Sequence, residues 1–278
     1  MKTTSPPLAG VVGWPIGYSR SPALHGHWLK RYGIAGYYIP MDIAPQDFEN
    51  GVRSLPRLGF RGINVTLPYK QTVLPLADKI SDRAALIGAA NTLIFREDGG
   101  IYADNTDGYG FIENLRQNAP GWSARNGPCL VLGAGGAARG IVSALITEGA
   151  PEIRIANRTR QRAEILKDQY GARINVIDWN RAADAMAGAM TIINTTSLGM
   201  AGQPELNISF AAAPGSAIAT DIVYNPLVTP FLREAASAGL VTVDGLGMLL
   251  HQAVPGFRQW FDHSPEVDAA LRQAVLAA

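Results

Sequence analysis

The chain has 278 residues, of which 47% are hydrophobic and 17% charged, and its 24 basic and 23 acidic side chains leave a net charge of +1. This length exceeds the usual size of one core, so we expect two domains with a binding cleft between them. The balanced charge argues against broad nucleic-acid binding, and the absence of a long apolar run argues against a membrane span or a secretory signal. We therefore expect a cytoplasmic protein that has neither nucleic-acid nor membrane partners.

The cysteine and histidine content argues against a disulfide-stabilised protein and against a metalloprotein. Cys129 is the single cysteine, so no internal disulfide can form. Its place in an apolar run favours a core position over a nucleophile. The four histidines do not have metal-ligand spacing. We expect no protein-bound metal.

The first hundred residues alternate short apolar strands with helices, and a hairpin turn lies at 97–100. The pattern predicts strands at 9–13, 37–41, 62–66, 91–95 and 101–103, and helices at 22–32, 47–55 and 82–87. A connecting helix is expected at 107–118, before a segment at 120–128 that is rich in helix breakers.

The second half continues as strands separated by helices and ends in helices alone. Strand candidates lie at 129–133, 153–156, 190–194, 217–223 and 241–243. Helices are predicted at 248–261 and 265–276, and we expect them to return to the first domain. The predicted fold is therefore α/β, with one domain formed by 1–108 and 246–278 and the other by 109–245.

The apolar run at 129–133 ends in glycines that open the next helix. Gly133 permits the strand-to-helix bend, Gly135 lets the backbone approach a pyrophosphate, and Ala138 allows close packing of a helix that begins near Gly136. A turn without a ligand is the alternative. A second apolar strand about 20 residues later completes a βαβ unit and favours a Rossmann-like dinucleotide site.

The residues after that second strand indicate which dinucleotide binds. An NAD site normally has Asp or Glu there, but this chain has Asn157-Arg158-Thr159-Arg160-Gln161-Arg162. A helix beginning at Thr159 would bring Arg158 and Arg162 toward one 2′-phosphate, with Asn157 and Thr159 adding hydrogen bonds. A solvated basic helix start is the alternative. We prefer NADP and expect 109–245 to be its binding domain.

Polar residues beside glycine or proline recur at the ends of the predicted elements. Each segment alone is also explained by helix caps, turns or an ordinary surface lysine. Together the segments resemble the shikimate dehydrogenase family over essentially the whole chain. They lie at 19–22, 64–70, 88–92, 104–108, 133–137, 157–159, 194–200, 224–230 and 245–252.

The resemblance implies reversible NADP-dependent reduction of 3-dehydroshikimate to shikimate in aromatic amino-acid biosynthesis, with 1–108 and 246–278 as the substrate domain. It implies Lys70 and Asp107 as the catalytic pair, in which the ammonium stabilises the developing alkoxide and supplies a proton. Which of the two transfers the proton is open, and a structural salt bridge is the alternative. The implied substrate-binding residues are Ser19, Ser21 and Tyr224 for the carboxylate, and Thr66, Lys70, Asn91, Asp107 and Gln252 for the hydroxyls.

The cofactor residues follow from the same resemblance. The pyrophosphate would lie on Gly133, Ala134, Gly135, Gly136 and Ala137, and the adenosine phosphate on Asn157, Arg158, Thr159 and Arg162. The ribose and nicotinamide would contact Thr195, Met200, Ile222, Gly245 and Met248, although both methionines are equally well explained as core residues.

Other readings stay open. A quinate/shikimate or aminoshikimate dehydrogenase is the nearest rival, and a non-catalytic NADP-sensing regulator is a different class. Tyr18 and Gly26 depart from the commonest family pattern, which bears on how the first loop closes. A monomer is as plausible as a homodimer. Glycines at Gly108, Gly110, Gly245 and Gly247 suggest a hinge that narrows the cleft.

Overall fold

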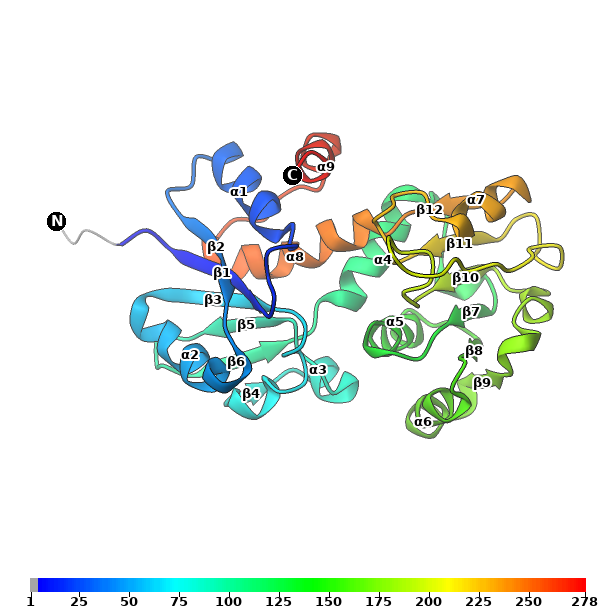
Figure 1. Ribbon diagram of the computed structural model, residues 1–278, viewed down its shortest axis with the longest axis horizontal. Helices are drawn as coiled ribbons and strands as arrows, with labels where there is room; N and C mark the ends of the chain where they lie inside the picture. Colours follow the sequence, from blue (N-terminus) through cyan, green and yellow to red (C-terminus); the bar gives the residue numbers. More distant parts are fainter. Residues whose placement is uncertain (1–4) are drawn as a thin grey trace. The chain divides into compact units, whose positions relative to one another are not determined.

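The computed structural model describes residues 5–278, which form two compact units (Figure 1). Unit 1 contains the chain up to Thr106 and again from Leu250 onward, and unit 2 contains Asp107–Leu249. Helix α8 (Leu246–Phe261) begins in unit 2 and ends in unit 1. Within residues 5–278, no helix has the length and apolar character needed to cross a membrane.

Unit 1 contains a mixed six-stranded sheet with the order β2-β1-β3-β5-β6-β4. Parallel pairing joins β1 to β2 and β3 and joins β4 to β6, whereas β5 runs antiparallel to β3 and β6. The strands are β1 (Leu8–Gly13), β2 (Tyr37–Asp42), β3 (Phe60–Val65), β4 (Lys79–Ile80), β5 (Thr92–Phe95) and β6 (Ile101–Asp104).

Two short helices of unit 1 begin at side chains that cap their free N–H groups. The Ser81 hydroxyl accepts a hydrogen bond from Ala84 N at the start of α3, and the Asp268 carboxylate accepts one from Leu271 N at the start of α9. The helices are α1 (Ser21–Arg31), α2 (Phe48–Ser54), α3 (Asp82–Ile87) and α9 (Ala269–Leu276), with 3-10 turns η1 (Pro45–Asp47), η2 (Leu55–Leu58) and η3 (Leu74–Leu76).

Unit 2 contains a six-stranded sheet in which every pair is parallel, with the order β12-β11-β10-β7-β8-β9. The chain moves outward from β7 in one direction and then from β10 in the other, so a topological switch point lies between these two strands. The strands are β7 (Cys129–Leu132), β8 (Ile153–Ala156), β9 (Ile174–Ile177), β10 (Thr191–Asn194), β11 (Ile218–Asp221) and β12 (Val241–Val243).

Helices cover both faces of this sheet, so its central strand is apolar on both sides. Cys129 and Val131 face one core cluster and Leu130 and Leu132 face the other, because successive side chains of a strand point in opposite directions. Burial raises the pKa of the Cys129 thiol to about 11, which suits a core residue. The helices are α4 (Asp107–Asn118), α5 (Gly136–Thr147), α6 (Arg160–Tyr170) and α7 (Pro230–Ser237), with 3-10 turns η4 (Ala124–Asn126), η5 (Gly171–Arg173), η6 (Trp179–Arg181) and η7 (Asp184–Met186).

Several element boundaries differ from the sequence prediction. Strands β4 and β9 were not predicted, and α9 begins four residues later than expected because Asp268 caps it. The predicted helix start at Thr159 is wrong by one residue: α6 begins at Arg160, and Thr159 has an extended backbone at its N-cap position.

Three of the glycines proposed as a hinge lie in tight packing inside unit 2. A Cβ at Gly108 would lie 2.8 Å from the Gly140 carbonyl oxygen, and a Cβ at Gly247 would overlap the Asn114 side chain. A Cβ at Gly245 would overlap the Ile222 backbone. Close approach therefore accounts for these glycines, and the hinge stays a prediction.

Candidate functional site

Four adjacent strands of unit 2 end in register, and the next residue of each is a predicted cofactor residue. Leu132 pairs with Ala156 on one side and with Asn194 on the other, and Asn194 pairs with Asp221. Parallel strands that end together deliver their following residues to one edge of the sheet. These following residues are Gly133, Asn157, Thr195 and Ile222.

The glycine turn after β7 has two different requirements for glycine. Gly133 has φ +111°, and a Cβ there would lie 2.6 Å from the Thr195 hydroxyl oxygen. A Cβ at Gly135 or Gly136 would meet no atom within 4 Å, and both residues are exposed. Gly135 precedes α5 without a side-chain cap for its first N–H groups. The exposed backbone and the positive end of the helix dipole suit a pyrophosphate.

Asn157 connects this turn to the loop after β8. Its Oδ1 accepts a hydrogen bond of 3.1 Å from the Ala134 backbone N–H, and its Nδ2 donates one of 2.8 Å to the Thr159 carbonyl. The side chain therefore holds the predicted pyrophosphate turn and the predicted 2′-phosphate loop beside each other.

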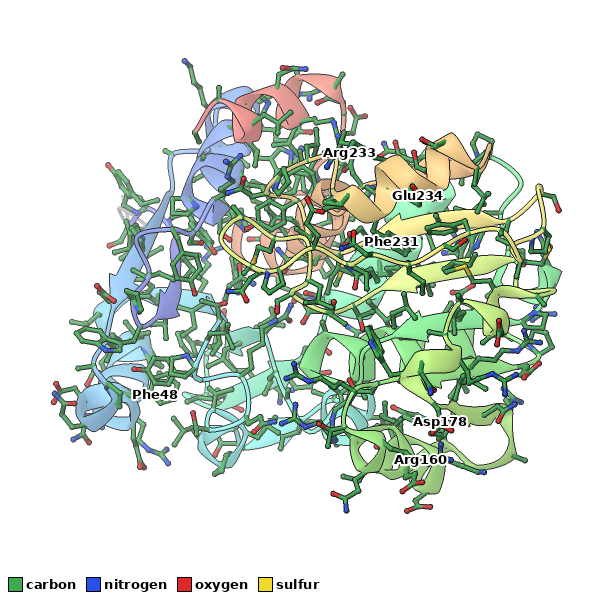
Figure 2. The ribbon with its side chains drawn as sticks, turned by 45° about the vertical axis from the view of Figure 1, so that its right-hand side comes forward. Phe48, Arg160, Asp178, Phe231, Arg233 and Glu234 are labelled. Carbon is green, nitrogen blue, oxygen red and sulfur yellow. The ribbon has the colours of Figure 1, made fainter. Side chains whose placement is uncertain are left out.

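The three arginines of that loop differ in their partners. Arg160 pairs with Glu164 at 2.8 Å and with Asp178 at 2.5 Å, and Figure 2 shows Arg160 beside Asp178. In the described part of the chain, neither Arg158 nor Arg162 forms an ion pair. Arg158 precedes α6, so helical spacing does not by itself bring it next to Arg162. Two exposed guanidinium groups nevertheless stay available for an anion.

A buried network fixes the loops that follow β10 and β11. The Asp221 carboxylate accepts hydrogen bonds from Asn194 Nδ2 at 3.0 Å, the Thr229 hydroxyl at 2.7 Å and Val223 N at 2.9 Å. Burial raises the pKa of Asp221 despite these donors. The network anchors the segment that carries Ile222 and Tyr224, a role the sequence reasoning missed.

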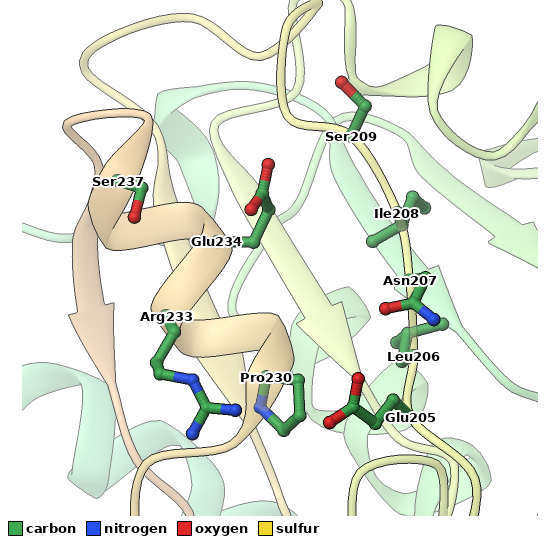
Figure 3. Close-up of a pocket in the computed structure, with 9 residues that line it drawn as sticks. All are labelled: Glu205, Leu206, Asn207, Ile208, Ser209, Pro230, Arg233, Glu234 and Ser237. Carbon is green, nitrogen blue, oxygen red and sulfur yellow. The ribbon is translucent and has the colours of Figure 1, made fainter.

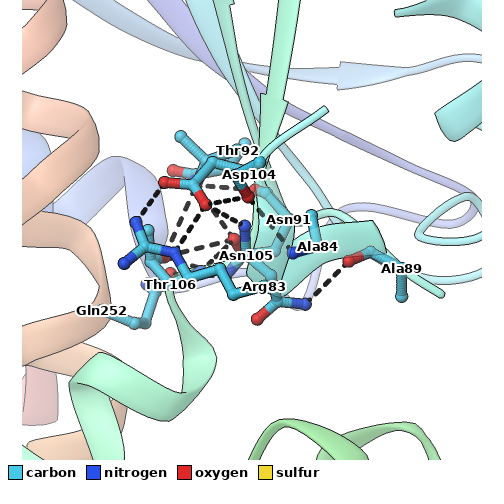
Figure 4. Close-up of polar contacts among 11 residues, drawn as sticks. Arg83, Ala84, Ala89, Asn91, Thr92, Asp104, Asn105, Thr106 and Gln252 are labelled. Atoms are coloured by element: carbon cyan, nitrogen blue, oxygen red, sulfur yellow. Dashed lines mark hydrogen bonds and ion pairs between the residues drawn. The ribbon is translucent and has the colours of Figure 1, made fainter. Parts of the chain in front are cut away.

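In unit 1, a second buried network joins residues far apart in the sequence (Figure 4). Asn91 Nδ2 donates to the Thr106 hydroxyl at 3.0 Å and to Gln252 Oε1 at 3.3 Å. Asn64 Nδ2 donates to the Asn91 carbonyl at 3.1 Å, and Tyr38 Oη donates to Asn64 Oδ1 at 2.7 Å. The structure thus brings the predicted substrate residues Asn91 and Gln252 together.

The sequence reasoning did not assign roles to the other members of this network. Asn64 and Thr106 lie in the polar segments that it singled out, so a signal existed for them. Tyr38 was interpreted only as part of a strand. Its phenol is buried, and burial raises its pKa well above the ordinary value.

The turn that precedes Asp107 is fixed by Asp104 (Figure 4). This carboxylate accepts hydrogen bonds from Arg83 Nε at 2.6 Å, the Ser81 hydroxyl at 2.7 Å and Asn105 N at 2.7 Å. Burial opposes ionisation of Asp104, but these donors, Arg83 foremost, hold its pKa below the ordinary value.

The remaining unit 1 candidates lie at the ends of elements. Ser19 Oγ accepts a hydrogen bond of 3.3 Å from Ser21 N at the start of α1. Thr66 follows β3, and its carbonyl closes a turn toward Lys70 by accepting from Tyr69 N at 2.8 Å. The Lys70 carbonyl accepts from Ala90 N at 2.7 Å, which holds Lys70 beside the segment of Asn91.

The other unit 2 candidates have varied surroundings. Asp107 is the first residue of α4 and is half-buried, as is Tyr224. Thr195 donates its hydroxyl to the Leu132 carbonyl at 2.8 Å. Met200 is exposed, whereas Met248 is partly buried and packs against a core cluster of unit 2. Pairing of Lys70 with Asp107 stays a prediction.

Unit 2 also has a groove that none of the predicted site residues lines (Figure 3). Its volume is about 610 Å³, and it lies between an extended segment and α7. The walls are Glu205, Leu206, Asn207, Ile208, Ser209, Pro230, Arg233, Glu234 and Ser237. Of its charged groups, Arg233 donates to the Val228 carbonyl at 3.3 Å.

Comparison with known proteins identifies the family. Residues 11–93 match the shikimate dehydrogenase substrate binding domain, 116–248 the shikimate/quinate 5-dehydrogenase family, and 245–276 the shikimate 5′-dehydrogenase C-terminal domain. The chain is 59% identical to shikimate dehydrogenase (NADP(+)) of Paracoccus denitrificans, covering 98% of this chain and 96% of that protein. It is 60% identical to the protein of the same name from Cereibacter sphaeroides, covering 98% of each.

Two solved structures agree with this result. Shikimate 5-dehydrogenase from Thermus thermophilus, in complex with NADP(H) and shikimate, has a TM-score of 0.86 at 35% identity, covering 97% of this chain and 98% of that one. Quinate dehydrogenase from Corynebacterium glutamicum, in complex with NAD, has a TM-score of 0.90 at 31% identity, covering 98% and 99%. The resemblance and the α/β fold inferred from the sequence are confirmed, and the chain belongs to the shikimate dehydrogenase family.

Proposed function

We propose that this chain catalyses the reversible NADP-dependent reduction of 3-dehydroshikimate to shikimate, a step of aromatic amino-acid biosynthesis. The observation that carries the proposal is the identity of 59% over 98% of the chain with a relative named shikimate dehydrogenase (NADP(+)). The local structure supports the cofactor. Two exposed arginines follow β8 where an NAD site normally has a carboxylate, and the glycine turn offers open backbone.

Unit 2 would hold the cofactor. Gly133, Gly135 and the start of α5 suit its pyrophosphate, and Arg158 and Arg162 suit its 2′-phosphate. When bound, NADPH supplies the hydride. The remaining candidates for the ribose and nicotinamide are Thr195, Met200, Ile222, Gly245 and Met248.

The substrate residues would bind and polarise the small acid. Hydroxyl groups of Ser19, Ser21 and Tyr224 would donate to its carboxylate, and the buried amides of Asn91 and Gln252 would orient its ring oxygens. The Lys70 ammonium would stabilise the negative charge that forms on the carbonyl oxygen at C3 and give it a proton. Asp107 would orient that ammonium and accept from the substrate hydroxyl.

Initial rates test this assignment directly. The parent is expected to oxidise shikimate with NADP, and Lys70→Ala is expected to lower kcat by about 10²- to 10⁴-fold. Lys79→Ala, at an exposed lysine of β4 in the same unit, is the matched control and should keep the parent rate. Full activity in Lys70→Ala would overturn the catalytic role, and an inactive parent would favour a nucleotide-sensing regulator.

Quinate oxidation is the second candidate, since a quinate dehydrogenase is among the similar structures. The same assay with quinate and NAD decides between the two substrates and the two cofactors. Faster turnover with quinate and NAD than with shikimate and NADP would overturn the proposal and identify a quinate dehydrogenase. A cytoplasmic location and a monomeric or homodimeric state stay predictions.

A further inference from the structure

The carboxyl end of β9 places an acidic side chain next to the predicted 2′-phosphate loop. Ala156 of β8 pairs with Ile177 of β9, so Asn157 and Asp178 are the next residues on neighbouring strands. Parallel neighbours lie about 4.8 Å apart. Asp178 therefore lies at the edge of the sheet where a dinucleotide-binding domain selects between a ribose hydroxyl and a phosphate.

A carboxylate at this edge would disfavour NADP. It accepts hydrogen bonds from a ribose 2′-hydroxyl, as NAD sites require, and it repels a 2′-phosphate. Glu164 adds a second carboxylate, one helical turn after Arg160 on α6. Both carboxylates are bound by the same guanidinium group, through Nε to Glu164 and Nη1 to Asp178.

We propose that Arg160 determines cofactor specificity by neutralising Glu164 and Asp178, which leaves Arg158 and Arg162 to attract the 2′-phosphate. The three arginines and two carboxylates leave one net positive charge around the loop, and without Arg160 that charge would be zero. Arg160 is thus a positioning residue that acts through the local field. This inference rests on the proposed function, because it assumes that NADP binds unit 2.

Calorimetric titration of the substrate-free protein with NADP and with NAD tests the inference without turnover. Arg160→Gln is expected to weaken NADP binding about three- to fivefold, from the Coulomb energy of one charge near a phosphate in a solvated site, and to leave NAD binding unchanged or tighter. Adding Glu164→Gln and Asp178→Asn to that variant leaves two net positive charges around the loop, so it is expected to restore NADP affinity to at least that of the parent.

Arg116 offers a matched control in the same unit. It also binds two carboxylates, Glu113 at 2.7 Å and Glu148 at 2.6 Å, and its side chain has the same 49% exposure as that of Arg160. Arg116→Gln should change neither cofactor affinity. Equal weakening of NADP and NAD by Arg160→Gln, or no restoration in the triple variant, would overturn the inference. Failure of the parent to bind NADP would instead overturn the proposed function.

Discussion

The buried imidazole of His25 makes the stability of this protein depend on pH. His25 lies in α1 and is fully buried, with its ring stacked on Tyr38 at 3.8 Å and 5° and packed against Trp28 and Phe257. Neither ring nitrogen forms a hydrogen bond within residues 5–278. Burial lowers its pKa from 6.5 to about 3, and the nearby Asn64 side chain opposes only part of this shift.

The direction of the pH effect on stability follows from the pKa of His25 in the folded and the unfolded protein. Below pH 6.5 the unfolded chain takes up a proton at His25, whereas the folded protein stays neutral there until about pH 3. Acid therefore favours unfolding across this window, at about 1.4 kcal/mol per pH unit. Between pH 7.5 and pH 5.0 the expected loss from this one group is about 2 kcal/mol.

Urea unfolding at these two pH values measures the loss. His25→Phe keeps an aromatic ring against Tyr38 but cannot titrate, so its loss of unfolding free energy should be about 2 kcal/mol smaller than that of the parent. Leu24→Ala is the control, because this fully buried neighbour in α1 should destabilise by about 2–5 kcal/mol at both pH values and keep the parent's pH dependence. A pH dependence in His25→Phe equal to that of the parent would refute the reasoning.

Gly133→Ala should lower the free energy of unfolding by about 1–3 kcal/mol, because a positive φ and the Thr195 hydroxyl both reject a Cβ. Gly135→Ala, where a Cβ meets open space, should leave urea unfolding unchanged within about 0.5 kcal/mol and weaken NADP binding measured by calorimetry; equal destabilisation by the two variants would contradict this. Arg83→Gln should cost about 1 kcal/mol at pH 7, because Asp104 loses its cationic partner. That cost should vanish as the pH falls through the lowered pKa of Asp104, and a cost that grew with acidity would count against it.

The strands and helices could be predicted from the sequence wherever the residues of the segment itself determine the secondary structure. Apolar runs of strand length with glycine or proline breaks identified all but two of the strands, and the parallel sheet of unit 2 confirms the Rossmann-like interpretation. Strand β4 has two residues, too few for a periodic signal. Strand β9 is the short alternating run Ile174-Asn175-Val176-Ile177, a strand signal that the sequence prediction did not use.

The site was predictable as a set of segments but not as a set of contacts. Asn91 and Gln252 are 161 positions apart, and the sequence carries no sign that their side chains share a hydrogen bond. Tyr38 looks like any strand residue until the sheet places Asn64 within reach of its hydroxyl. Helix α6 begins one residue later than the sequence predicted, because the backbone of Thr159 is extended. The periodicity of apolar residues does not indicate the backbone conformation at a helix end. The individual binding and catalytic roles stay predictions.

The double hydrogen bond of Asn157 limits how this protein could evolve a different coenzyme preference. Its amide nitrogen donates to the Thr159 carbonyl while its amide oxygen receives the Ala134 N–H. A single change to aspartate, the acidic residue that favours NAD, would exchange the donor for an anion facing a carbonyl oxygen. The Asn157→Asp change would remove the hydrogen bond that holds the loop at Thr159 while it altered the coenzyme preference of that loop. A compensating substitution near Thr159 would therefore have to precede it.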